Sequence, residues 1–275
     1  MTTMNKSDDT LTRMHGLRAS LYNDPWMLAS EADLGVLVDQ IEAATIRAAN
    51  GEFAMTDDHG ALYETLGDGV AVIPVIGTIS RRSSFLTMLF GGAVLSDLEA
   101  ALDEATADTS VNEIVIQFNS PGGSVDGIFA TAAKIQSLSI HGDKTIRAFV
   151  ETAASAAYLL ASQCDEIIIQ PGGMAGSIGV IAQVPDFSRM DKNKGIDTRI
   201  FRSAPGVGPM TETAAAAIQK QVDSLFTRFR DAVSDVRSHA LSIDAVSTGD
   251  TWLDHDAVAI GIADRVATFD ELIFE

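Results

Sequence analysis

The chain has 275 residues, of which 19 are basic and 38 acidic, and its formal net charge of −19 at pH 7 opposes binding to nucleic acid or to an anionic membrane surface. Its single cysteine, Cys164, excludes an internal disulfide, no Cys/His cluster has metal-ligand spacing, and no run of about 18 apolar residues predicts a membrane span. With 46% hydrophobic residues, we expect a globular protein of a reducing compartment, without metal, cofactor, signal peptide or membrane anchor.

The N-terminal part predicts a helix followed by a linker. A turn at Asp24-Pro25 precedes apolar residues at helical spacing, which end near Gly51. The stretch 52–69 is polar and mixed, which is typical of a linker. We therefore divide the chain into an N-terminal helical extension with its linker, residues 1–66, and a main domain, residues 67–275.

The main domain alternates predicted strands and helices. The first strand, "VAVIPVIGTIS", is expected to bend or end near Pro74. Alternation of this kind implies βαβ units and a largely parallel sheet with helices packed on it. Strands are predicted at 70–80, 111–120, 144–151 and 166–171, and helical segments within 81–108, 121–138, 155–163 and 210–240, the last with Ile218, Val222, Leu225, Phe226 and Phe229 on one face.

The stretch "FNSPGGSVDGI", residues 118–128, leads from a predicted strand into a Gly-Gly turn and a helix. Two consecutive glycines let the backbone turn sharply and present N–H groups that can hold a developing oxyanion. The alternative is an ordinary turn between strand and helix. Phosphate binding is a weaker alternative, because no Lys-Ser/Thr pair follows as in a P-loop.

Two further stretches contain candidate site residues. In "VETAASAAYLLAS", Ser155 stands among alanines at the predicted opening turn of a helix, where a peptide could reach its hydroxyl. In "GGMAGSIGVI", glycines at a strand edge suggest close approach of the backbone to a ligand or to a neighbouring strand. The alternative for the first stretch is tight packing of a helix through its small residues, and the alternative for the second is a simple turn. The five histidines lie in linker or surface-like stretches, so nothing indicates a Ser/His/Asp triad.

Taken in order, "NSPGGSVDGI", "AASAAYLLAS", "AGSIGVI" and "GDTWLDHDAVAIGIADRV" resemble peptidase family S49, the signal peptide peptidase A-like proteases. "NDPWML" and "VAVIPVIGTI" are similar to the branch that tailed phages and prophages use as capsid maturation or scaffold proteases. The resemblance runs from about residue 20 to the C-terminus. It implies an α/β, ClpP/crotonase-like fold of repeated ββα units and a serine endopeptidase with a Ser-Lys dyad.

The resemblance also implies roles for particular residues. Ser155 matches the nucleophile, Gly122 and Gly123 match the oxyanion-hole turn, and Gly176, Ser177, Ile178 and Gly179 match a segment that borders bound substrate. A buried lysine, whose pKa burial lowers, would take the proton from the serine.

The position of that lysine is the main departure from the family pattern. It should follow the predicted strand "DTRIFRS", and Val207 stands there by spacing, within a few residues. No lysine occurs between Lys194 and Lys220. Three explanations compete: an engineered inactive variant, a natural pseudoprotease, or a base supplied from elsewhere, although Arg202 stays charged and cannot serve.

We therefore expect a cytoplasmic endopeptidase, in the host cytoplasm or within an assembling procapsid, that acts on scaffold, portal or capsid proteins and forms a homo-oligomeric ring. The main alternative is a catalytically dead assembly protein that binds an extended peptide near Gly122, Ser155 and Gly176 by strand addition. A signal-peptide peptidase fits less well, because that work favours a membrane anchor. A hydratase acting on acyl-CoA is the remaining alternative that the fold can host.

Overall fold

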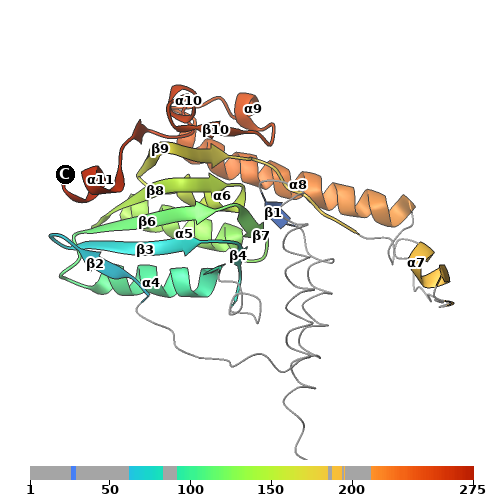
Figure 1. Cartoon of the computed structure of the whole chain (residues 1–275), viewed down its shortest axis with the longest axis horizontal. Helices are drawn as coiled ribbons and strands as arrows, with labels where there is room; N and C mark the ends of the chain where they lie inside the picture. The colour runs from blue at the N-terminus through green and yellow to red at the C-terminus, as the bar shows by residue number, and fades with distance from the viewer. Residues whose placement is uncertain (1–25, 29–61, 83–91, 185–187, 194, 196–211) are drawn as a thin grey trace, which may run out of the picture.

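The computed structural model describes residues 26–28, 62–82, 92–184, 188–193, 195 and 212–275 (Figure 1). Their main feature is a seven-stranded sheet of order β10-β9-β8-β6-β3-β2, with β11 also paired to β9. Neighbours among β3, β6, β8 and β9 pair in parallel, while β2 and β10 are antiparallel strands at the two edges. The strands are β2 Glu64–Leu66, β3 Val70–Ile76, β6 Glu113–Ser120, β8 Thr145–Ala154, β9 Glu166–Gly176, β10 Thr251–Leu253 and β11 Arg265–Val266.

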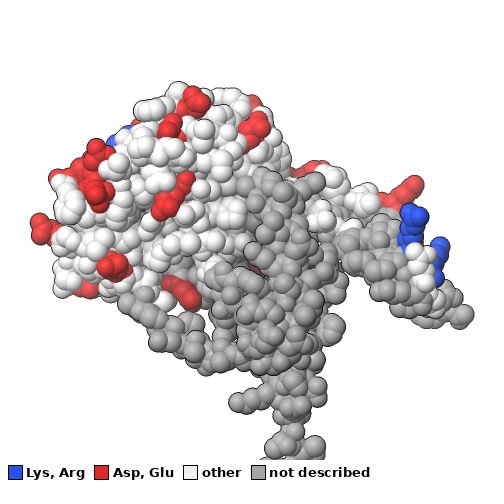
Figure 2. Space-filling view, viewed as in Figure 1, with Lys and Arg blue, Asp and Glu red and all other residues white. Residues whose placement is uncertain are grey.

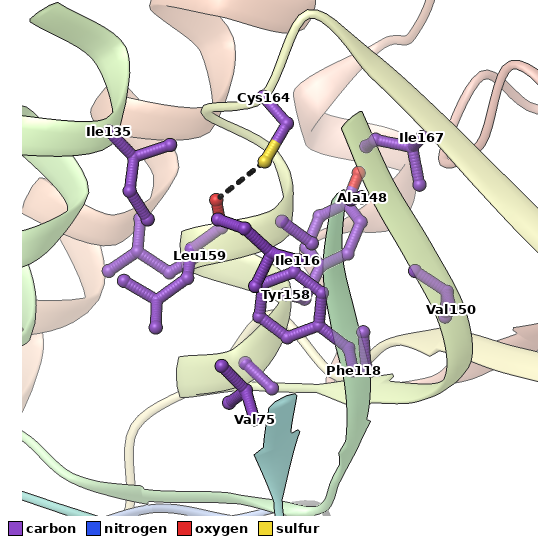
Figure 3. Packing of buried hydrophobic residues seen from close by; sticks show 14 of the residues in the cluster. Val75, Ile116, Phe118, Ile135, Ala148, Val150, Tyr158, Leu159, Cys164 and Ile167 are labelled. Atoms are coloured by element: carbon purple, nitrogen blue, oxygen red, sulfur yellow. Dashed lines mark hydrogen bonds between the residues drawn. The ribbon is translucent and has the colours of Figure 1, made fainter. Parts of the chain in front are cut away.

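Helices cover both faces of this sheet, and one face forms the main core. Along β6, Ile114, Ile116 and Phe118 are fully buried in a cluster shared with α4, α5, α6 and α8, as Figure 3 shows in part. Val115 and Phe149 point to the other face, where they pack with residues of α11. The helices are α4 Leu95–Ala107, α5 Ile128–His141, α6 Ala156–Ala161, α8 Glu212–Arg237 and α11 Phe269–Ile273.

The observed architecture confirms the predicted α/β class with its largely parallel sheet. Of the strand predicted over 70–80 with a bend or end near Pro74, β3 covers Val70–Ile76, so it ends two residues after Pro74, and it pairs with β6 along its whole length. On its other side β3 pairs with β2 only from Val70 to Val72. Pro74 therefore lies where one side of β3 has no described partner strand, and proline is tolerated in a sheet at such edge positions.

A second sheet of four strands, of order β1-β7-β4-β5, lies at the carboxyl end of the main one (Figure 1). The Gly-Gly stretch forms β7 in this sheet rather than an open turn. Residues 26–28 form β1, so the helix predicted after Pro25 is wrong for these three residues, and the rest of that prediction lies outside the described residues. The strands are β1 Trp26–Leu28, β4 Ile79–Ser80, β5 Ala93–Val94 and β7 Gly122–Ser124.

The C-terminal part holds the long predicted helix in place. In α8, Phe229 and Val233 are buried in the main core. Arg237, 3% exposed, donates to both carboxylate oxygens of Asp264 and to the Gly261 carbonyl. The N-terminal half of α8 extends past the end of the sheet (Figure 1). Three short helices complete the described elements: α7 Ser188–Asn193, α9 Ile243–Val246 and α10 Asp254–Ala259.

The division at residues 66 and 67 stays a prediction, although β1 and β2 both pair with strands of the later part. Acidic side chains are spread over the face seen in Figure 2, with few basic ones among them. None of the helices in the described ranges is long and apolar enough to cross a membrane.

Candidate active site

Three segments with predicted site residues lie at the carboxyl ends of neighbouring strands in the main sheet. Strands β6, β8 and β9 are parallel neighbours, with Ser120 opposite Ala153 and Ala154 opposite Gly176. The residues that follow their carboxyl ends therefore emerge side by side. In open α/β sheets this edge is where ligands bind. The structure thus brings together the Gly-Gly strand, Ser155 and the segment from Gly176 onward.

Ser155 occupies a sharp turn between β8 and α6. Its backbone angles, φ 53° and ψ −114°, lie in a region that side chains with a Cβ adopt only under strain. A serine on such a strand-to-helix turn is the geometry of a nucleophile elbow, which aims the hydroxyl away from both flanking elements. Hydrogen bonds fix the turn, because the Ser155 N–H donates to the Gly176 carbonyl at 2.8 Å and the Ser155 carbonyl accepts from Leu159 at 2.9 Å.

Ser155 is completely buried, as are the alanines on both sides of it. Its Oγ donates to the Gly179 carbonyl at 3.2 Å, which orients the hydroxyl but provides no base. The alanines on both sides place no bulky side chain next to the hydroxyl. In this conformation, however, a peptide cannot reach Ser155 without a displacement of the residues that cover it.

The Gly-Gly strand fits tightly into the second sheet and contacts α6. A Cβ at Gly123 would overlap the carbonyl oxygen of Ile79 on β4, so only glycine allows this approach. The Gly122 N–H donates to the buried Ser120 Oγ at 3.1 Å. An oxyanion at Gly122 would therefore have to replace the Ser120 hydroxyl as acceptor.

The segment Gly176–Gly179 forms the opposite wall of the site. Gly176 has φ 123°, and a Cβ there would lie 2.8 Å from the Trp252 ring of β10. Ser177 also has a positive φ, 55°, and its N–H donates to the Asp250 carbonyl at 2.6 Å. Gly176, Ser177 and Ile178 are buried, and Gly179 is half-buried. The segment at the end of β9 thus contacts β10 on one side and Ser155 on the other.

No titratable side chain that the structure describes is bonded to Ser155. Lys134 and Lys144 donate to backbone carbonyls in and directly after α4. Lys192 on α7 and Lys220 on α8 are exposed. Val207, the position expected for the dyad lysine, lies outside the described residues.

Other titratable groups near the core are poor substitutes. His141, His239 and His255 are exposed, as the sequence predicts. Burial raises the pKa of the Cys164 thiol and of the Tyr158 hydroxyl, so both stay protonated at neutral pH. The Tyr158 hydroxyl donates to the Ile262 carbonyl at 3.1 Å, so this buried hydroxyl has a hydrogen-bond partner. Among the described residues, no group of three His, Cys, Asp or Glu side chains is placed to hold a metal ion.

Two features of the site are absent from the sequence analysis. Ser120, directly before the Pro-Gly-Gly turn, satisfies the Gly122 N–H, and its place two residues before the glycine is the pattern of a local side-chain-to-backbone bond. The pairing of Trp26–Leu28 with β7 joins segments almost a hundred positions apart, and no local pattern predicts it.

Together, the parallel sheet, the crossover helices and a serine at a strained strand-to-helix turn define an α/β protein with a buried serine at the carboxyl end of its sheet. Residues 141–275 match the model of peptidase family S49. The chain is 30% identical over 189 residues to probable protease SohB of Haemophilus influenzae, covering 66% of this chain and 52% of that protein. The resemblance to family S49 found in the sequence is thereby confirmed.

A phage protein is also among the relatives. The head-tail preconnector protein GP5 of Enterobacteria phage P21 is 28% identical over 243 residues, covering 85% of this chain and 48% of that protein. Protease 4 of Haemophilus influenzae is 27% identical over 210 residues, covering 74% of this chain and 34% of that protein. The chain thus spans about half, or less, of the length of these curated relatives.

Solved structures of similar shape include two classes. A mutant of the 1510-N membrane-bound stomatin-specific protease has a TM-score of 0.48 at 16% identity, covering 75% of this chain and 84% of that one. An enoyl-CoA hydratase from Mycobacterium marinum has a TM-score of 0.40 at 17% identity, covering 77% and 82%. Both TM-scores are below 0.5, so neither likeness carries an argument about fold or chemistry.

Proposed function

We propose that this protein is a serine endopeptidase with Ser155 as its nucleophile. The observation that carries the proposal is the strained turn at Ser155, which places a serine at the carboxyl edge of the sheet between the Gly-Gly strand and Gly176–Gly179. A backbone strained at one functional-type residue is retained only where the surrounding structure enforces it. Here three hydrogen bonds and complete burial enforce it.

Gly122 and Gly123 are the proposed oxyanion donors. They begin the strand that contacts α6, and a substrate carbonyl would have to take the place of the present acceptor of the Gly122 N–H, the Ser120 hydroxyl. Loss of one such donor typically lowers the rate by about 10²- to 10³-fold. Gly176, Ser177, Ile178 and Gly179 form the proposed substrate-binding wall.

The proposed substrates are head proteins of a phage: scaffold, portal or capsid proteins cleaved during assembly, within a procapsid or in the host cytoplasm. The similarity to the GP5 preconnector protein of phage P21 supports this setting. A homo-oligomeric ring that shields the sites is part of the proposal. A Ser-Lys dyad in this chain requires a base that Val207 cannot supply.

The second candidate is a peptide-binding assembly protein with the same fold and no activity. It is favoured by the same valine, and by the fact that the described part of the chain offers Ser155 Oγ only a backbone carbonyl as acceptor. The two candidates differ in one chemical property, the nucleophilicity of Ser155. That property can be measured without knowing the natural substrate.

The test combines labelling with cleavage. A fluorophosphonate probe is applied to the wild-type chain, to Ser155→Ala and to Val207→Lys, and the labelled residue is identified by mass spectrometry. Ser162→Ala is the matched control, because Ser162 is also completely buried and lies at the far end of α6, outside the proposed site. Co-expression with a matching scaffold and capsid protein then reports cleavage by the same variants.

If the wild type is labelled and cleaves, and only Ser155→Ala loses both properties, the protein is a peptidase. Its base is then a residue other than Val207. Activity that appears only in Val207→Lys would identify the missing lysine as the lesion. If no variant is labelled or cleaves while all of them fold, the binding protein is the correct reading.

A further inference from the structure

The Gly-Gly strand has two edges, and both are occupied. β4 pairs in parallel with one edge, with Ile79 opposite Gly123. β1 pairs antiparallel with the other, with Trp26, Met27 and Leu28 opposite Ser124, Gly123 and Gly122. An extended peptide that adds to a sheet needs a free strand edge for its main-chain hydrogen bonds. The β4 edge is the less accessible of the two, because Ile79 is fully buried in the main core, so a peptide would pair where β1 now lies.

The burial of the site residues also indicates that a peptide must displace part of the chain to enter. Gly122, Gly123, Ser155, Gly176 and Ser177 are all buried. A site that acts on protein chains has to be opened before a chain can enter. β1 is beside β7 at this end of the molecule (Figure 1), and it belongs to a segment far from β7 in sequence.

We propose that Trp26–Leu28 is a built-in occupant of the extended-peptide site, which an incoming peptide must displace. The inference rests on the proposed peptide-binding role of the site and adds both a regulation and a substrate class. Because an occupant and its competitor use the same backbone pairing, the competing peptide is an extended segment. The apolar sequence Trp-Met-Leu indicates that an uncharged, apolar stretch suits the site.

Covalent linkage makes this competition strong. The segment is part of the same chain, so it rebinds as an intramolecular partner at a high effective concentration. A free peptide of equal intrinsic affinity therefore binds weakly to the intact chain. Removing the pairing ability of the segment, without changing β7, should expose the site.

The test compares three full-length forms that share a Ser155→Ala background, so that no cleavage consumes the probe. In the released form, Trp26→Gly, Met27→Pro and Leu28→Gly prevent strand pairing. In the locked form, Trp26→Cys and Ser124→Cys form a disulfide. These residues are directly opposite, at a typical Cα separation of about 4.5–5.5 Å, which a disulfide spans. The third form keeps the native segment.

A fluorescein-labelled peptide with the sequence of residues 22–31 is the probe, and fluorescence anisotropy gives its affinity. We expect the released form to bind it roughly tenfold or more tightly than the native form, and the oxidised locked form to bind it least. A scrambled peptide should show no such ranking. Equal binding by released and locked forms would overturn the proposal.

A second measurement guards against misfolding. The pair Leu28→Cys and Ser124→Cys is two residues out of register, at about 7–8 Å, and should not cross-link. If the in-register pair also fails to cross-link, β1 does not occupy β7. If the released form loses its cooperative thermal melt, β1 is a permanent strand rather than a displaceable one. Either result overturns the inference, whereas failure of the peptidase proposal would show in labelling and cleavage alone.

Discussion

At the scale of single residues, Ser155 combines a left-handed backbone with complete burial. A serine with these angles costs about 1–3 kcal/mol relative to relaxed backbone. That cost makes sense where the residue's hydroxyl has a task, since glycine would adopt the turn without strain. The local structure therefore conflicts with stability at the residue proposed as the nucleophile.

Replacing Ser155 by glycine and by alanine separates strain from hydroxyl loss. Both variants lose the hydrogen bond to Gly179, but only alanine keeps a Cβ at φ 53°. We expect Ser155→Gly to be more stable than Ser155→Ala by about 1–2 kcal/mol in urea denaturation. Ala154→Gly, on the adjoining strand residue without a positive φ, should instead lose about 0.5–1 kcal/mol. A higher stability for Ser155→Ala would contradict the strain.

At the scale of elements, the fold follows closely from sequence pattern. Nearly continuous apolar runs predict β6, β8 and β9 because these strands are buried on both faces. The face of α8 with Ile218, Val222 and Phe229 follows from helical periodicity, and its members are half-buried or buried. The sequence does not reveal, however, how short β2 is, which pairs with β3 only from Val70 to Val72.

The candidate site is only partly predictable for the same reason. The four motifs locate Ser155 and its glycines, but the strained angle at Ser155, the Ser120 bond and the β1–β7 pairing depend on tertiary contacts. The base is a different case. Spacing relative to the family pattern alone puts Val207 at the position expected for the dyad lysine, and that assignment stays a prediction.

Two ion pairs on α8 give a prediction for the elements it joins. Arg237 is buried and bonded to Asp264, whose carboxylate also accepts the Ile167 N–H of β9. Arg230 pairs with Asp244, whose side chain is 85% exposed. Removing the partner of a buried charge costs about 3–5 kcal/mol, whereas an exposed pair contributes about 0–1 kcal/mol.

We therefore expect Asp264→Ala to lower the free energy of unfolding by about 3–5 kcal/mol, and Asp244→Ala by about 1 kcal/mol or less. Thermal or urea denaturation measures both. Asp264→Asn should lie between them, because its amide oxygen can still accept a hydrogen bond. Equal losses for the two alanine variants would show that the Arg237 pair does not fasten α8 to β9 and β11.

At the scale of the whole molecule, the main electrostatic feature is an excess of negative charge. The chain carries 38 acidic against 19 basic residues. Excess charge of one sign destabilises the compact state, because folding brings the charges closer together. Salt screens this repulsion, and the Debye length shrinks from about 30 Å at 0.01 M to about 8 Å at 0.15 M.

Raising NaCl from about 0.01 M to about 0.15 M at pH 7 should therefore raise the melting temperature, because it relieves repulsion over distances comparable with the molecule. A gain of about 1 kcal/mol corresponds to roughly 2–4 °C for a chain of this size. Near pH 4.4, the isoelectric point, the same salt step should have no such effect, because the excess charge has been neutralised by protonation. An equal rise at both pH values would show that salt acts on something other than net charge, such as hydration of apolar surface.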